Sequence, residues 1–170
     1  MKVVGIVGRK KAGKTTIAVH LIKKLMRPGS PVYMYDVNNE YTRKFGIPNS
    51  YTGEVNPTKF LDKVFHVKNS VIVFEEATSY FSNRGRDEKL MDLMTRCRHT
   101  NNVVLLIFHS LADLPPSVYR QCEYICLFKT NDFRTSLDQK YRKSEQFLPI
   151  YDRIKMHHDE HYFEIFENLG

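Results

Sequence analysis

The 170-residue chain is 42% hydrophobic and 26% charged, values that suit one soluble domain with a full core. Its formal net charge of +7 favours acidic partners, and nucleic acid first among them. No apolar run reaches the length of a membrane span and no signal peptide precedes the first strand, so we expect a cytoplasmic protein with no membrane insertion.

The first elements that the sequence predicts are a buried strand, a glycine-rich loop and a helix. Residues 2–7 are a short run rich in Val and Ile, and apolar residues recur at helical spacing over residues 17–25. Between them the pattern G-x-x-x-x-G-K-[ST] is met by Gly8, Gly13, Lys14 and Thr15. Strand, loop and helix are together the context in which this pattern forms a phosphate site.

Phosphate binding needs each part of this loop. Glycines let the backbone curl so that several N–H groups face one anion, and the helix adds its positive N-terminal end. We expect Lys14 to reach the β- and γ-phosphates of ATP and the Thr15 hydroxyl to bind Mg²⁺. The alternative is a glycine turn before an ordinary helix. The expected cofactor-binding residues are Gly8, Arg9, Lys10, Lys11, Ala12, Gly13, Lys14, Thr15 and Thr16.

A second strand is predicted over residues 32–37, after a strong turn signal at residues 27–31. Asp36 lies near the end of this strand, where it faces the nucleotide or caps the turn, and we favour the cap. Residues 38–51 are expected to form an irregular connection with a short helical turn. Residues 57–67 then predict a helix, because Pro suits its first turn and its apolar residues form one face.

Residues 71–74 predict a buried strand that ends in two adjacent carboxylates, Glu75 and Glu76. Acids at the carboxyl end of a parallel strand lie where open α/β sheets bind ligands. Beside a phosphate loop, one carboxylate holds Mg²⁺ through its water shell and the next polarises the water that attacks the γ-phosphate. We assign Glu75 to the metal and Glu76, as a catalytic residue, to the water. The alternative is a solvated strand end.

The middle of the chain predicts a polar loop over residues 79–87 and a helix over residues 88–98. Residues 103–108 are almost wholly apolar, which is typical of a central parallel strand rather than an exposed one. This strand ends in His109 and Ser110, again at a carboxyl end.

The last part of the chain contains weaker signals. Leu114-Pro115-Pro116 is expected to act as a rigid stop, followed by a strand over residues 123–129, a helix over residues 135–143 and an edge strand over residues 161–166. The stretch 157–161 is rich in His and acids but fits no metal motif, and we interpret it as a solvated tail. Three residues without metal-type spacing are expected to be reduced packing residues: Cys97, Cys122 and Cys126.

Strands alternating with helices predict a three-layer α/β/α fold with a mostly parallel sheet, in one domain over residues 1–170. Residues 131–170 are interpreted as a C-terminal extension of unknown role. The phosphate loop, the paired glutamates and the later apolar strand with a polar end together resemble the additional-strand P-loop ATPases. That resemblance places the strand 103–108 between the phosphate-loop strand and the acidic strand, and implies that His109 is a catalytic sensor of the γ-phosphate.

Residues 71–128 resemble the FtsK/HerA-like superfamily of DNA pumps and its small viral genome-packaging members. The matching pieces are VIVFEEA, TRCRHTNNVVLLIFHS and LPPSVYRQCEYICLFK, and their order also resembles the Zot-type assembly proteins of filamentous phages. The resemblance implies a homo-oligomeric ring, a pentamer or a hexamer, in which one subunit donates an arginine to its neighbour's ATP. Arg96 and Arg98 match that step as catalytic candidates, with Arg98 favoured. The other candidates are Arg84, Arg86 and Arg120.

Three functions compete on these features. The first is an ATPase that moves double-stranded DNA and packages a viral genome at a capsid vertex in the host cytoplasm. A small-molecule or nucleoside kinase suits the short length, but no lid segment is recognisable, and adjacent glutamates suit water activation better than hydroxyl transfer. A Zot-like assembly factor that uses nucleotide would be expected to carry a membrane anchor.

Overall fold

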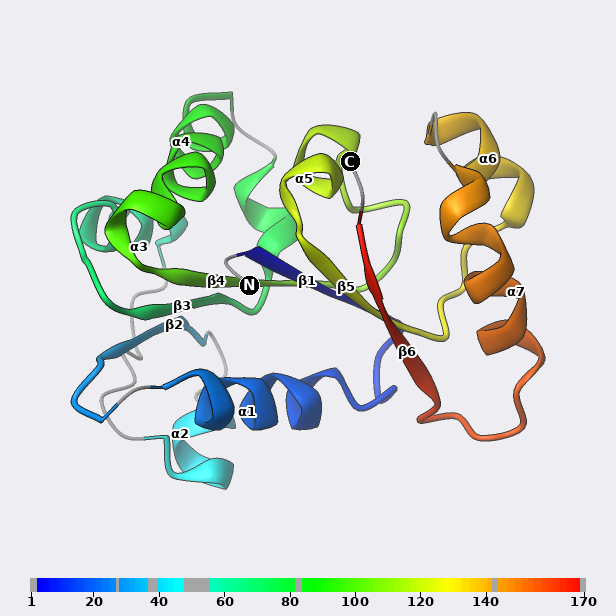
Figure 1. Ribbon diagram of the computed structural model, residues 1–170, viewed down its shortest axis with the longest axis horizontal. Coiled ribbons are helices and arrows are strands. Elements are labelled where there is room, and N and C mark those ends of the chain that lie inside the picture. Colours follow the sequence, from blue (N-terminus) through cyan, green and yellow to red (C-terminus); the bar gives the residue numbers. More distant parts are fainter. Residues whose placement is uncertain are drawn as a thin grey trace.

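The computed structural model describes residues 3–26, 28–36, 40–47, 56–81, 84–141 and 144–168, which form a six-stranded sheet between helical layers (Figure 1). The strand order is β2-β3-β4-β1-β5-β6, and all neighbouring strands are parallel except β5 and β6, which are antiparallel. The strands are β1 (Val3–Val7), β2 (Val32–Tyr35), β3 (Val71–Phe74), β4 (Val103–Phe108), β5 (Tyr124–Phe128) and β6 (Phe163–Glu167). The expected three-layer, mostly parallel fold is confirmed.

Strand β4 lies between β1 and β3, as the resemblance to additional-strand ATPases implies. Val7 of β1 is in register with Phe108 of β4, and Leu106 of β4 is in register with Phe74 of β3. The three strands therefore end near one another, and the residues that follow them meet at the carboxyl edge of the sheet.

Helices cover both faces of the sheet (Figure 1). The helices α1 (Lys14–Leu25) and α2 (Glu40–Phe45) lie on one face, and α3 (Pro57–Val64), α4 (Arg84–Thr100) and α5 (Pro116–Gln121) on the other. The helices α6 (Arg134–Lys140) and α7 (Leu148–Met156) lie beside β5 and β6. Two apolar clusters fill the two sides, one under α1 and α2 and the other under α3 to α7.

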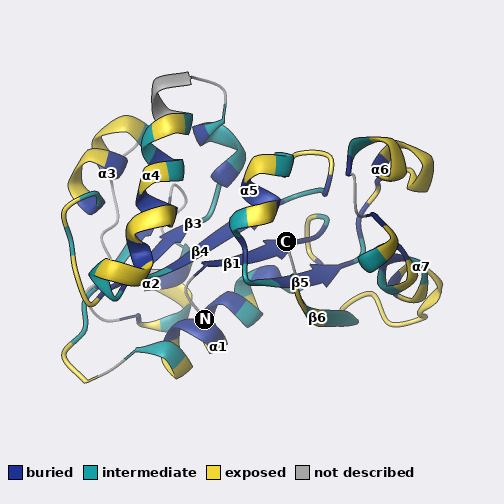
Figure 2. Ribbon diagram, turned by 45° about the horizontal axis from the view of Figure 1, so that its top comes forward, coloured by how far each residue is buried: buried dark blue, intermediate teal, exposed yellow. Residues whose placement is uncertain are grey.

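Burial explains the strand patterns. Every residue of β1 and β3 is buried, because helices cover both of their faces (Figure 2). No residue of strand β6 is buried, and Ile165 and Glu167 are exposed, as is typical of an edge strand. Its position as the last strand, at the edge of the sheet, confirms the expected edge strand.

Local capping accounts for two helix starts. The Asn56 side chain accepts a hydrogen bond from Thr58 N at 2.9 Å, and Pro57 occupies the first turn of α3. The Asp36 carboxylate accepts hydrogen bonds from Glu40 N at 3.0 Å and Tyr41 N at 2.9 Å, so it caps α2 as expected. Residues 38–39 and 48–51 of the expected irregular connection lie outside the described residues.

Several elements differ from the sequence predictions. The expected polar loop 79–87 is partly helical, because a 3₁₀ helix spans Ala77–Tyr80 and α4 already begins at Arg84. Pro115 and Pro116 end one segment but also begin α5, since proline is tolerated at the first turn of a helix. Helix α6 ends at Lys140, and residues 142–143 lie outside the described residues. Helix α7 was not expected.

The segment after β5 is built into the same core. The Tyr141 hydroxyl donates to the carbonyls of Leu111 and Leu114 at 2.7 and 2.6 Å, and the Asp132 carboxylate accepts from Leu111 N at 2.8 Å. These bonds fix the loop that follows β4. All three cysteines are buried as thiols. Within the described ranges, no helix combines the length and apolar character needed to cross a membrane.

Candidate nucleotide site

The phosphate loop passes between the carboxyl ends of β4 and β5. Gly8 N donates to Phe108 O at 3.2 Å, and Arg9 N donates to Lys129 O at 2.8 Å. A Cβ atom on Gly8 would lie 2.5 Å from the Phe128 Cβ, so only glycine fits at this position. The first glycine of the motif is therefore explained by the close approach of β5.

Two residues in the left-handed region turn the loop into α1. Lys11 has a φ of 66° and Gly13 a φ of 104°, a conformation in which glycine has no steric cost. Lys14 is the first residue of α1, so the loop amides and the positive end of the helix converge at this point. The structure thus has the strand, loop and helix that the motif requires.

Lys14 is held inward over the loop. Its side chain is 7% exposed and its Nζ donates to Arg9 O at 2.9 Å. Burial lowers the pKa of Lys14, and the negative charges of Glu76 and Glu75 oppose this shift. A buried ammonium group with one carbonyl partner is well prepared to exchange that partner for a phosphate oxygen.

The two glutamates that follow β3 have different surroundings. Glu76 Oε1 lies 3.3 Å from His109 Nε2, which follows the neighbouring strand β4. Burial raises the pKa of Glu75 to about 8, and the nearby Asp36 carboxylate adds to this shift. The structure therefore places Glu76 against His109 and Glu75 against the carboxylate that caps α2.

The residues expected to bind Mg²⁺ fit a divalent cation. Glu75 Oε2 is buried without a hydrogen-bond partner. Tyr41 is oriented toward Thr15, the other expected ligand, and its pKa is raised by burial and by the carboxylate of Glu75. The charge of a cation would offset the crowding of carboxylates around Glu75. Within the described ranges no group of three His, Cys, Asp or Glu residues is arranged to hold a metal ion by itself, but Mg²⁺ keeps several waters and needs fewer protein ligands.

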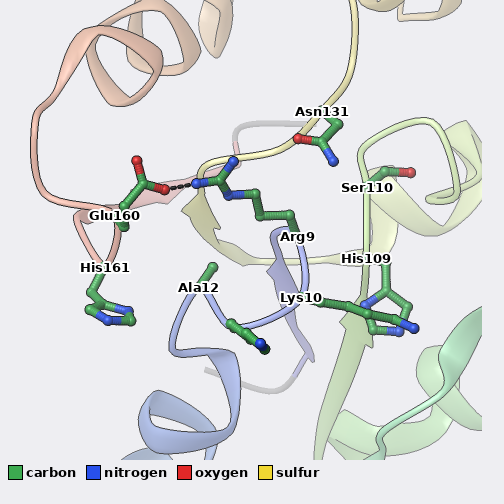
Figure 3. A pocket seen from close by; sticks show the side chains of 9 residues that line it. Arg9, Lys10, Ala12, His109, Ser110, Asn131, Glu160 and His161 are labelled. Atoms are coloured by element: carbon green, nitrogen blue, oxygen red, sulfur yellow. Dashed lines mark ion pairs between the residues drawn. The ribbon is translucent and has the colours of Figure 1, made fainter.

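A cavity of about 750 Å³ opens beside the phosphate loop, and four stretches of the chain line it (Figure 3). His109 and Ser110 come from the end of β4, and Asn131 follows β5. The loop residues on this cavity are Arg9, Lys10, Lys11 and Ala12. The remaining wall comes from Glu160 and His161 near the C-terminus. The sequence analysis brought all of these together except Ser110, Asn131, Glu160 and His161, which it did not assign to the site.

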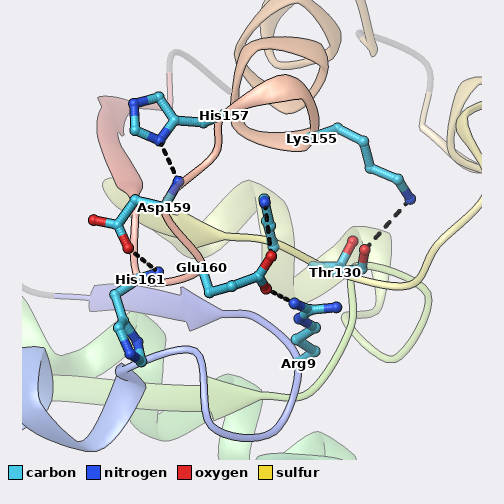
Figure 4. A network of polar contacts seen from close by, with 8 residues as sticks. Arg9, Thr130, Lys155, His157, Asp159, Glu160 and His161 are labelled. Atoms are coloured by element: carbon cyan, nitrogen blue, oxygen red, sulfur yellow. Dashed lines mark hydrogen bonds and ion pairs between the residues drawn. The ribbon is translucent and has the colours of Figure 1, made fainter.

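Glu160 connects the C-terminal segment to the phosphate loop (Figure 4). Its carboxylate forms an ion pair with Arg9 and a second one with Lys129 Nζ at 3.1 Å. Residues 157–161 are exposed, as the interpretation as a solvated tail predicts, but Glu160 and His161 also line the cavity beside the phosphate loop. The antiparallel pairing of β6 with β5 brings this segment to the site, and the sequence analysis predicted the edge strand without its partner.

Arg96 and Arg98 lie away from this cavity. Arg98 Nη2 pairs with Glu123 Oε1 at 3.1 Å, and Arg96 pairs with Asp92 at 3.7 Å. Arg98 and Glu123 lie near the starts of β4 and β5, at the amino edge of the sheet, about 15–20 Å from the phosphate loop by strand length. Neither arginine reaches the ATP site of its own chain. The side chains of Arg84 and Arg86 lie outside the described residues.

The loop, the paired glutamates and the polar end of the middle strand define the P-loop NTPase fold of the additional-strand type. The structure is similar to the genome packaging NTPase B204 of Sulfolobus turreted icosahedral virus 2 in complex with AMP, with a TM-score of 0.73 and 22% identity over 98% of this chain and 92% of that chain. The structure is also similar to B204 from Sulfolobus turreted icosahedral virus, a DNA-packaging ATPase, with a TM-score of 0.72 and 20% identity over 98% of this chain and 92% of that chain.

A bacterial protein shares the fold at lower identity. ATPases 2 and 3 of EssC from Geobacillus thermodenitrificans match with a TM-score of 0.66 and 11% identity, over 98% of this chain and 38% of that chain. No protein-family model and no curated protein matches the sequence. At these identities the likeness is one of fold, and it covers the C-terminal segment as well as the phosphate loop.

Proposed function

We propose that this chain is an ATP-hydrolysing motor that moves double-stranded DNA, and that it packages a viral genome. The observation that carries the proposal is the contact between Glu76 and His109 at 3.3 Å, on neighbouring strands beside the phosphate loop. A carboxylate next to a polar strand end is the arrangement that couples water activation to the presence of a γ-phosphate.

The residues divide the work of hydrolysis among them. Lys14 and the loop amides hold the phosphates, and Lys14 is already dehydrated by burial, which strengthens its attraction to an anion. Glu76 orients the attacking water and takes its proton. Mg²⁺ held through Thr15 and Glu75 would supply positive charge to the β- and γ-phosphates. His109 contacts Glu76 and borders the same cavity, so a γ-phosphate there would change the position of both side chains.

The packaging role is supported by charge and by fold. The net charge of +7 favours an acidic polymer as partner, and the similar viral structures are those of packaging NTPases. We infer a homo-oligomeric ring of five or six subunits docked on a capsid vertex, because neither Arg96 nor Arg98 reaches the ATP site of its own chain.

The test is steady-state ATP hydrolysis at increasing protein concentration, with and without double-stranded DNA. We expect turnover per subunit to rise with protein concentration and to rise further with DNA. Turnover that is indifferent to both would contradict the motor proposal. Phosphate transfer to an added nucleoside, with little release of inorganic phosphate, would establish a kinase instead.

A further inference from the structure

A second cavity, of about 520 Å³, lies next to the phosphate loop on the other side of His161. Gly13 ends the loop at its edge, Ile17 and His20 of α1 form one wall, and Phe128 of β5 and Phe163 of β6 form the other. His161 borders both cavities, so the two spaces adjoin at this residue. The volume is within the ~300–1,000 Å³ of sites for small organic ligands.

The lining of this second cavity is mostly apolar and includes the polar residues Thr16, His20 and His161. The rings of Phe128 and Phe163 stack with their centroids 4.8 Å apart and an angle of 26° between their planes. His20 and His161 are exposed and carry ring nitrogens that donate or accept hydrogen bonds. Such a site takes a planar aromatic ring, which stacks on the apolar wall and pairs its polar edge with the histidines.

The C-terminal segment holds this wall in place. Glu160 is paired with Arg9 of the loop and with Lys129 after β5, while His161 N donates to Asp159 Oδ1 at 2.8 Å (Figure 4). The antiparallel register sets Phe163 opposite Phe128. Two ion pairs and one strand pairing therefore fix the segment between residues 160 and 163 relative to the loop.

We propose that this cavity binds the purine base of the nucleotide, and that the C-terminal segment of unassigned role forms the base-binding wall. Phe163 and Phe128 supply the stacking surface, and His20 and His161 contact the polar edge of the base or the ribose. A purine covers more of the aromatic wall than a pyrimidine does, so the site favours ATP and GTP over CTP and UTP. This inference rests on the proposed nucleotide site.

The test compares ATP with inorganic tripolyphosphate, which has the phosphates and lacks the base. Binding of each is measured by calorimetry in excess Mg²⁺ for wild type, Phe163→Leu and His20→Ala. We expect Phe163→Leu to weaken ATP binding about 5- to 10-fold and His20→Ala about 2- to 5-fold. Tripolyphosphate binding should change less than about twofold in both variants, because no phosphate contact is altered.

Matched controls are Phe133→Leu and His158→Ala, which change an exposed ring and an exposed imidazole outside the lining of both cavities. Both should bind ATP as the wild type does. Equal loss of both ligands in Phe163→Leu, or unchanged ATP binding in both variants, would overturn the base site. Wild-type protein that binds tripolyphosphate as tightly as ATP would overturn the base site and leave the phosphate loop standing. Wild-type protein that binds neither ligand would refute the nucleotide site itself.

Discussion

Lys14 acts in ATP binding and Glu76 in hydrolysis in the proposed reaction, so single substitutions can separate the two stages. Glu76→Gln keeps the shape of the side chain but removes the base, so hydrolysis should fall about 10²- to 10⁴-fold while ATP binding is kept. Lys14→Ala removes the buried ammonium group and should weaken binding itself. Calorimetry and phosphate release measured on the same samples separate the two effects. Hydrolysis at the wild-type rate by Glu76→Gln would contradict the assignment of the water-activating residue.

Glu75 gives the site a pH-dependent stability in the absence of metal. Burial and the Asp36 carboxylate raise its pKa from 4.5 to about 8, so the folded state holds the proton more tightly than the unfolded state. The stabilisation is therefore complete below pH 4.5 and is lost as the pH rises toward 8. Glu75→Gln removes this loss, because the amide carries no charge at any pH.

In EDTA at pH 8, Glu75→Gln should have a higher Tm than the wild type, by a few °C, because about 1 kcal/mol corresponds to 2–4 °C at this chain length. The difference should shrink at pH 5, where the wild-type carboxyl keeps its proton in the fold. Thermal melts at the two pH values measure it. If the difference in Tm between Glu75→Gln and the wild type is the same at pH 5 and pH 8, Glu75 does not titrate in this interval.

Individual site residues were predictable from sequence where the chemistry is local. The phosphate loop, Glu75, Glu76 and His109 all directly follow buried strands, so strand direction alone brings them to one edge. Glu160 and His161 were missed, because their place depends on the edge pairing of β6 with β5, more than thirty residues away. The proximity of Asp36 to Glu75 follows from the parallel pairing of β2 with β3, in which Tyr35 is in register with Phe74.

At the scale of elements, the uniformly apolar strands were predictable, and the helices α5 and α7 were not. The strands β3 and β4 have the predicted bounds, because uniform apolar runs between polar residues leave no other interpretation. Helix α5 has six residues and starts at a proline, which the sequence analysis interpreted only as a stop. Helix α7 buries Leu148, Tyr151 and Ile154, a spacing of three that was present in the sequence but surrounded by charged residues.

One buried amide joins two elements at the amino edge of the sheet. Asn102 is fully buried, and its side chain accepts from Ser70 N at 3.0 Å and donates to Val67 O at 2.9 Å. Asn102→Ala would leave two backbone groups without partners and should reduce the free energy of unfolding by about 2–4 kcal/mol. Nucleotide affinity should be unchanged at temperatures where the variant is folded, because the phosphate loop lies at the opposite edge.

The matched control for Asn102 is Asn101→Gly. Asn101 has a φ of 56° and its side chain makes an exposed hydrogen bond to Asn69 at 2.9 Å, so glycine keeps the backbone conformation and removes an exposed contact. Chemical denaturation should show a change of about 0.5 kcal/mol or less for this variant. A similar loss in both variants would mean that the turn, rather than the buried amide, carries the stability.

For the whole molecule, the proposed ring has one testable requirement, an arginine that a second subunit donates to each ATP site. Arg98 is 71% exposed and pairs with Glu123, and an exposed pair contributes only about 0–1 kcal/mol, so this arginine is readily exchanged to another anion. If Arg98 is the arginine donated to a neighbour, Arg98→Ala should bind ATP and fail to hydrolyse it. Arg96→Ala, which loses a pair to Asp92 on the same helix, is the control and should remain active.

Mixing two inactive variants tests this arrangement directly. A site made of Glu76 from an Arg98→Ala subunit and Arg98 from a Glu76→Gln neighbour is complete, whereas each variant alone has none. In an equal mixture about one site in four has this composition, so hydrolysis should recover to about a quarter of the wild-type rate. Recovery requires subunits to exchange, which a labelled wild-type ring verifies. No recovery under exchange would show that Arg98 does not act across a subunit interface, and the search would move to Arg84, Arg86 and Arg120.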